Sequence, residues 1–415
     1  MALVKLFFIL GLLILLLRRG WLLGNALLTA AVVCVLLQQV YPLEFFGIVM
    51  HSFKNVQNWL LTCIILSILI FAHSMSKTDY ANRFIKAYQS FSPNVKFNLM
   101  MIPAFIGLLP MPGGAIFSAP FVERLSEDTQ VPRSTQAIVN YWFRHCFEFS
   151  WPLYPGLILA AHLAQTDLFY LISFQIPFTL LAFYLGYHAY IKPLQMTILT
   201  KKTKRETTFI KEVAPIGMVL ILAVFGKCLL PSLPREVNIG LAVWMGILWI
   251  WIKERINLHK LKEIFTEKTL LKVLYAVFGI FVFKQTLNET QIVTQASKIL
   301  VDYHIPLGFI AALLPLLTGL IIGLTLAFVG VTFPLIVTLI HTMHVPHLPY
   351  VVLAFVCGVI GVLLSPMHLC FVLSLEYFQV RFDQIHRKLY RPCFVLLLAA
   401  GICFFLLKGY NGPCK

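Results

Sequence analysis

The chain has 415 residues, of which 59% are apolar and only 12% are charged. A soluble domain is usually about half apolar and about a quarter charged, and no soluble chain of this size buries so much apolar surface. The composition therefore excludes a soluble enzyme, a nucleic-acid-binding domain and a disordered protein. Lys and Arg outnumber Asp and Glu, 33 against 17, which in a membrane protein indicates basic cytoplasmic loops.

Taken in chain order, the apolar stretches predict ten membrane crossings. A membrane helix needs about 20 apolar residues, with roughly 17 as the short limit. The first stretch ends at Arg18 and Arg19 without a small-residue cleavage site, so we interpret it as a retained membrane helix. The predicted crossings are residues 2–17, 21–38, 58–75, 137–164, 168–191, 213–231, 238–252, 269–287, 350–378 and 392–408.

Two further apolar stretches, 99–122 and 307–340, are interrupted by Pro and Gly. Proline removes a backbone donor and glycine permits tight turns, so neither stretch is typical of a single helix. We predict that each stretch is a re-entrant hairpin, which enters and leaves the membrane on the same side.

The basic residues set the predicted orientation. With the N-terminus outside, the cytoplasmic segments are 18–20, 76–136, 192–212, 253–268 and 379–391, and they hold 23 of the 33 Lys and Arg residues. The outer loops and the termini hold six. Basic residues collect on the cytoplasmic side of membrane proteins. We therefore predict a protein of the cytoplasmic (inner) membrane with both termini outside.

The two halves of the sequence repeat weakly. Pro120 is followed 32 residues later by Pro152, Pro334 is followed 32 residues later by Pro366, and the two pairs are offset by 214 positions. Each half has five crossings, an odd number, so the halves have opposite orientations, as in many secondary transporters. The predicted inverted repeats are residues 1–200, with the hairpin 99–122 and the broken helix 137–164, and residues 201–415, with the hairpin 307–340 and the broken helix 350–378.

Backbone that is broken inside a membrane predicts a binding site. Unpaired backbone groups are costly in lipid and persist where protein or water covers them, and free N–H groups at a helix start attract anions. The alternatives are a kinked helix packed against its neighbours and hydroxyls bonded to the preceding turn. The residues assigned to substrate binding on this basis are Pro112, Gly113, Gly114 and Ser118 in the first stretch, and Gly330 and Thr332 at a bend expected over residues 330–334 in the second.

Charged and polar residues within the spans predict further site residues. Asn140, Arg144 and Glu148 are spaced four apart, so a helix places them on one stripe. Arg144 offers a donor fork suited to an anion, and Asn140 and Arg144 are assigned to substrate binding. Glu148, His145 and His368 are candidates for ion coupling, because they change charge on proton uptake. The alternatives are an Arg144–Glu148 pair that braces the helix and histidines that are merely hydrogen-bonded.

Several other signals point to no cofactor. The cysteines are scattered singly, and His341, His344 and His347 lie in a proline-containing loop without an acid nearby, so no metal site is predicted. The sequence shows no Walker loop, nucleophile elbow or HExxH motif. Coupling to H⁺ or Na⁺ is the only role expected for an ion, and no enzymatic activity is predicted.

Four motifs resemble the DUF401 family of integral membrane proteins. They are GLLPMPGGAIFSAPFVE (107–123), NYWFRHCFEFSWPLYPG (140–156), GLTLAFVGVTFPLI (323–336) and GVLLSPMHLCFVLSLEYF (361–378). The family is grouped with the ion transporter superfamily, whose members move dicarboxylates, citrate, gluconate or arsenite, or exchange Na⁺ for H⁺. The resemblance implies an ion-transporter-superfamily-like fold, an elevator mechanism and a homodimer. The Ser-Asn-Thr signature of the Na⁺-coupled carboxylate carriers is absent, which favours H⁺ coupling.

The leading hypothesis is a secondary active transporter of a small anion, expected to be organic. The hairpins enclose the solute, Arg144 neutralises it and Glu148 is the coupling or pairing acid. A cation/proton antiporter with Glu148 as its ion site is the first alternative, and a membrane enzyme or assembly factor without transport is the second. The expected partners are the anionic solute, the lipid bilayer and a second copy of the chain, without nucleic acid.

Overall fold

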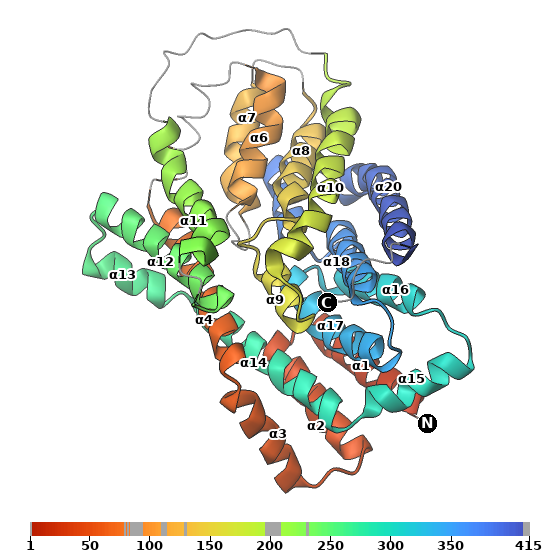
Figure 1. Cartoon of the computed structure of the whole chain (residues 1–415). Coiled ribbons are helices and arrows are strands. Elements are labelled where there is room, and N and C mark those ends of the chain that lie inside the picture. The colour runs from red at the N-terminus through yellow and green to blue at the C-terminus, as the bar shows by residue number, and fades with distance from the viewer. Residues whose placement is uncertain are drawn as a thin grey trace.

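The structure, a computed structural model, describes residues 2–78, 80, 83, 94–108, 114–127, 131–195, 209–229 and 232–409. All regular structure in these residues is helical (Figure 1), which confirms the predicted all-α fold class. Seven described helical segments are long and apolar enough to cross a membrane, and four shorter apolar helices accompany them.

The helices pack in two groups. The first, which we call the frame, is formed by the N-terminal helices and the middle of the chain, with α14 packed on α2, α3 and α4, and α12 packed on α4 and α11. The frame consists of α1 (Ala2–Arg18), α2 (Leu23–Leu37), α3 (Pro42–Lys54), α4 (Val56–Ser76), α11 (Phe209–Leu229), α12 (Arg235–Lys253), α13 (Leu258–Phe265) and α14 (Lys268–Glu289).

The second group, which we call the core, holds both interrupted regions. Its helices α8 and α18 are deeply buried, and α6, α7, α16, α17, α19 and α20 pack around them. The core consists of α6 (Val95–Gly107), α7 (Ala115–Ser126), α8 (Arg133–His145), the 3₁₀ turn η1 (Cys146–Phe149), α9 (Pro155–Leu163), α10 (Leu168–Gly186) with its π turn η2 (Tyr187–Ile191), α16 (Leu307–Ile322), α17 (Thr325–Thr342), α18 (His347–Leu364), α19 (Leu369–Phe378) and α20 (Phe382–Gly409).

The frame and the core touch along a limited boundary. Helix α14 packs on α17, α1 on α16, and α4 on α9. Helix α15 (Ile292–Asp302) contacts α1 and α14 on one side and α17 on the other, so it connects the two groups.

Each predicted broken helix is interrupted near its predicted proline. Helix α8 runs into η1, and regular structure stops until α9 begins at Pro155, with Pro152 in between. Helix α18 ends at Leu364 and α19 begins at Leu369, with Pro366 in between. Proline lacks the N–H that a continuing helix needs and its ring clashes with the preceding turn, which explains both stops.

The second apolar stretch breaks at a different place from the predicted one. Helix α17 runs unbroken through residues 330–334, so the bend expected there is wrong. The break lies earlier, where Gly323 adopts a φ of 69° and Leu324 is extended. A left-handed conformation of this kind suits glycine, which has no Cβ to clash. Pro334 is accommodated inside the helix, as Pro120 is in α7.

The two helices that form each interrupted stretch are short. Helices α6 and α7 have 13 and 12 residues and pack against each other. At about 1.5 Å per residue, neither spans a hydrocarbon core of about 30 Å. Helices α16 and α17, with 16 and 18 residues, also pack against each other around the break at Gly323.

Glycines allow α16 and α18 to approach closely, and a substitution at one of them tests how much this contact contributes to stability. A Cβ added to Gly361 would overlap the carbonyl oxygen of Leu316 and lie 3.0 Å from the backbone nitrogen of Leu320. Backbone atoms cannot move aside alone, so the helices must separate. We expect Gly361→Ala to destabilise the protein by about 1–3 kcal/mol, measured as a lower thermal unfolding midpoint in detergent. Gly401→Ala is the control, because its Cβ meets nothing within 4 Å; equal losses in both variants would contradict the packing argument.

Candidate functional site

Four helices of the core begin beside the interruptions of the chain, and these starts define the candidate site. They are the starts of α7 at Ala115, α9 at Pro155, α17 at Thr325 and α19 at Leu369, and none is capped by a side-chain hydrogen bond. The first backbone N–H groups of a helix have no partner within the helix, and the helix dipole makes this end positive. The contacts described next hold the four starts together.

Arg144 lies at the start of α7. Its side chain is buried, with 3% of its surface exposed, although it lies in the last turn of α8. A Cβ on Gly114 would overlap Nη2 of Arg144 and lie 2.5 Å from Cζ, so the guanidinium rests directly on this glycine. The predicted site residues Gly114 and Arg144 are therefore neighbours.

Asn140 joins α7 and α19. It is fully buried, and its Nδ2 donates to the carbonyl oxygen of Ala115 on α7 and to Oγ of Ser374 on α19, at 3.1 Å each. Within the described part of the chain, its Oδ1 has no hydrogen-bond partner. Asn140 thus both fixes the site and presents a free acceptor there.

Glu148 faces the break of the second half. The hydroxyl of Thr325, the first residue of α17, donates to Oε1 of Glu148, while Oε2 is buried and has no hydrogen-bond partner among the described residues. A Cβ on Gly156 would lie 2.6 Å from Cγ2 of Thr325. The starts of α9 and α17 are therefore in contact beside this carboxylate.

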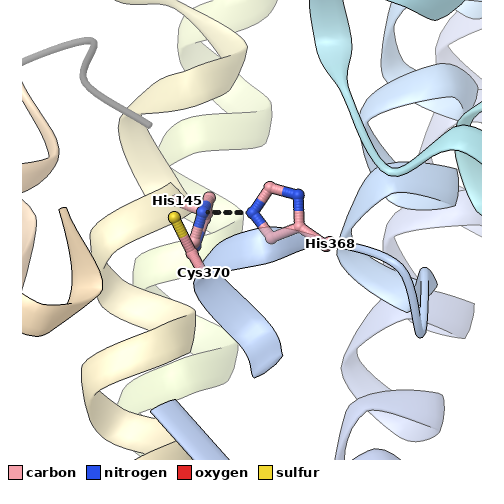
Figure 2. A group of neighbouring side chains, drawn as sticks. All are labelled: His145, His368 and Cys370. Carbon is pink, nitrogen blue, oxygen red and sulfur yellow. Dashed lines mark hydrogen bonds between the residues drawn. The ribbon is translucent and has the colours of Figure 1, made fainter. Parts of the chain in front are cut away.

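His145 and His368 form a direct pair at the centre of the site. Their Nε2 atoms are 2.9 Å apart, Nδ1 of His145 lies 2.6 Å from the carbonyl oxygen of Tyr141, and Nδ1 of His368 lies 2.7 Å from that of Gly323. The Cys370 sulfur lies beside the pair (Figure 2), and one potential ligand atom from each of the three residues lies within 4.8 Å of the other two. All three side chains are buried.

The other residues predicted for substrate binding lie elsewhere. The hydroxyls of Ser118 and Thr332 donate to carbonyl oxygens of their own helices, at Ala115 and Phe328. Gly330 lies inside α17, where a Cβ would meet the side chain of Ile280 on α14. Pro112 and Gly113 lie outside the described residues.

Several residues of the site were not predicted. Thr325, Ser374 and Cys370 are single polar residues in apolar helices, and only the fold brings them to the breaks. Gly323 offers a sequence signal for the break, because a polar threonine follows it two residues later. The bend was instead expected over residues 330–334. Tyr154 is also new: its hydroxyl donates to the carbonyl oxygen of Gly107 at 2.7 Å and holds the first break against α6.

A cavity lies between the frame and the core. Its volume is about 760 Å³. Arg18 and Lys272 line it from the frame, and Leu324, Pro366 and His386 line it from the core. The cavity therefore reaches both breaks of the second half and is basic on the frame side.

Together these features define a polytopic helical membrane protein with interrupted helices that meet in a buried, polar site. The chain belongs to the family described as protein of unknown function DUF401, whose model matches residues 1–407. Among solved structures it is similar to the Alcanivorax borkumensis YdaH transporter, whose crystal structure is described as having an unusual topology, with 11% sequence identity, 89% of each chain covered and a TM-score of 0.67. At this identity the likeness shows a shared fold. A comparison with curated proteins gives no match.

Proposed function

We propose that the protein is a secondary active transporter of a small, organic anion across the cytoplasmic membrane. The observation that carries this proposal is the meeting of four uncapped helix starts beside the buried Arg144. Helix starts and a guanidinium both stabilise negative charge, and in a water-poor site each is worth more than at a surface. The fold of a solved transporter favours transport over catalysis.

Glu148 is the group we assign to proton coupling. Its carboxylate is buried and its Oε2 has no partner within the described residues, so proton uptake at this oxygen breaks no observed hydrogen bond. His145 and His368 were equal candidates in the sequence, but their facing nitrogens already engage each other. Protonation of Glu148 also lowers the negative charge beside the anion, which links the two binding events.

The two helix groups support an elevator mechanism. The site lies entirely on core helices, whereas the frame contacts the core along α1, α4 and α14. The 760 Å³ cavity lies on that boundary and reaches the breaks at Leu324 and Pro366. Movement of the core along the frame carries the site across the membrane without taking it apart. The two inverted repeats, each with a re-entrant hairpin and a broken helix, supply the related inward and outward positions.

Contacts between distant loops support the proposed orientation. On the proposed cytoplasmic side, Lys388 donates to Ser134 and Lys253 pairs with Glu212, each at 3.2 Å. These contacts join segments that the basic residues assign to one side.

The proposed outer segments are joined in the same way. Gln38 donates to the carbonyl oxygen of Thr290 at 3.2 Å, and the Thr166 hydroxyl lies 3.4 Å from Nδ1 of His347. We propose ten crossings with both termini outside, and these contacts support the grouping of the loops on two sides. A homodimer completes the proposal.

Flux through proteoliposomes tests the proposed function. The purified full chain is reconstituted, and one labelled anion at a time is supplied outside the proteoliposomes, from a panel of mono-, di- and tricarboxylates and inorganic anions. We expect uptake of at least one anion to exceed that of empty liposomes and to rise with an imposed pH gradient. Equal fluxes across the whole panel with and without protein would overturn anion transport.

Replacement of the coupling acid gives a separate prediction. We expect Glu148→Gln to abolish the stimulation of uptake by a pH gradient while anion-for-anion exchange persists, because an amide cannot take up the coupling proton at neutral pH. Glu376→Gln, an exposed acid on α19, is the control and should retain the stimulation. If the Glu148→Gln protein still responds to the gradient as the wild type does, another group carries the proton.

A cation/proton antiporter is the second candidate, and it is favoured by Oε2 of Glu148, which has no hydrogen-bond partner among the described residues. In that case Glu148 binds the cation and Arg144 adjusts its affinity. Sodium-dependent proton flux in proteoliposomes that contain no organic anion supports this function. Anion uptake without such flux excludes it.

A further inference from the structure

The hydrogen bonds of the histidine pair fix which ring nitrogens carry protons. Nδ1 of His145 faces the carbonyl oxygen of Tyr141, and Nδ1 of His368 faces that of Gly323. A carbonyl oxygen only accepts, so both Nδ1 atoms must be donors. A neutral imidazole has a single N–H, and therefore each Nε2 bears a lone pair.

Two lone pairs 2.9 Å apart repel each other unless a cation lies between them. The cation is either a proton shared by the two rings or a metal ion bound by both. Charge is costly in a buried site and needs a partner. The pair is buried, with His145 and His368 exposed by 4% and 8%, so the neighbouring groups decide which cation fits.

Cys370 is the neighbour that favours a metal. Its sulfur and one ring nitrogen of each histidine lie within 4.8 Å of one another (Figure 2), and the sulfur, two residues after His368, is a potential third ligand. Imidazole and thiolate are the ligands that zinc prefers, and a thiolate also offsets the positive charge of the bound ion. We propose that His145, His368 and Cys370 bind one zinc ion.

The geometry needs only small adjustments for binding. With Zn–N bonds of about 2.0–2.1 Å, two nitrogens of a tetrahedral zinc lie roughly 3.3 Å apart, which is close to the observed 2.9 Å. Metal-bound histidines usually donate their other N–H to a carbonyl oxygen, which orients the ring. Both histidines already make this bond. Sodium, magnesium and calcium prefer oxygen ligands and do not suit this set.

The proposed ion joins the two halves of the core. His145 ends α8 of the first half, while His368 and Cys370 lie at the start of α19 in the second. The ion therefore holds the two breaks together and leaves Arg144 and the starts of α7, α9 and α17 to the solute. This inference does not depend on the transported solute, because it concerns binding of the metal alone.

Metal binding to the purified full chain tests the proposal. The protein carries an affinity tag without histidine, is stripped with a chelator and is dialysed against Zn²⁺ or Co²⁺. We expect about one Zn²⁺ per chain, a higher melting temperature with Zn²⁺, and sulfur-to-cobalt charge-transfer absorption with Co²⁺. Cys370→Ser should remove the absorption and lower the Zn²⁺ affinity at least about tenfold.

Cys146→Ser is the matched control. This buried thiol follows His145 directly and contacts the carbonyl oxygen of Trp142 at 3.5 Å, and its loss should leave the metal content and the cobalt absorption unchanged. A wild-type chain that binds no Zn²⁺ or Co²⁺ overturns the proposal and leaves a shared proton between the histidines. Equal loss of the metal in both variants also overturns it. The wild-type cobalt absorption reports the thiolate ligand even if Cys370→Ser does not fold.

Discussion

An Arg144→Gln protein should fold and reach the membrane but take up anions at least about 10–100-fold more slowly than the wild type. A hydrogen bond to a charged group contributes about 1.5–3 kcal/mol, which corresponds to that factor in binding. Arg144 is the cation that lies at the start of α7, against Gly114. Uptake of the labelled anion into proteoliposomes at matched protein content measures the effect.

Two companion variants sharpen this result. Arg391→Gln removes an exposed arginine from α20 and should leave uptake unchanged. Arg144→Lys keeps the charge but loses the planar donor fork, so we expect an intermediate rate and altered preference among carboxylates. Wild-type uptake by Arg144→Gln would show that the guanidinium has only a structural role.

Gly114→Ala should reduce uptake nearly as much as the loss of Arg144, although the arginine is still present. The added Cβ would overlap the guanidinium itself, with Cζ at 2.5 Å. The end of a flexible side chain can move, so the fold survives while the donor fork leaves its position. We expect a melting temperature close to that of the wild type and a strongly lowered uptake, both measured on the same preparation.

Gly107→Ala is the structural counterpart. There the Cβ would overlap the carbonyl oxygen of Arg144 and lie 2.9 Å from its carbonyl carbon, so α6 must move away from α8. This variant should lose stability as well as uptake. If Gly114→Ala also melts early, its loss of uptake cannot be assigned to the guanidinium.

The sequence predicted the helices well because its apolar stretches are long. The predicted crossing 58–75 is α4 (Val56–Ser76), and the crossing 269–287 is α14 (Lys268–Glu289). The interruptions beside Pro152 and Pro366 also lie where they were expected. Proline fixes φ and has no backbone N–H, so it often ends a helix. Short helices outside the long apolar stretches, such as α3 and α15, carry a weaker signal and were not predicted.

The candidate site was only partly predictable. Asn140, Arg144 and Glu148 stand out as polar residues in an apolar span, and the structure places all three at the breaks. The bend of the second half was misplaced because Pro334 suggested it, whereas the helix tolerates that proline and breaks at Gly323. These residues contact side chains and backbone groups from distant parts of the chain, and no local sequence pattern predicts such contacts.

The cavity on the boundary between frame and core has a consequence for inhibition. It separates Arg18 and Lys272 on one wall from Leu324 and Pro366 on the other. A rigid, acidic and amphipathic molecule of matching size would bind in this cavity and block movement of the core along the frame. In the proposed orientation Arg18 is cytoplasmic, so under the proposed mechanism this molecule would arrest the protein in the conformation described here, act from the cytoplasmic face, and not compete with solute supplied at the opposite face.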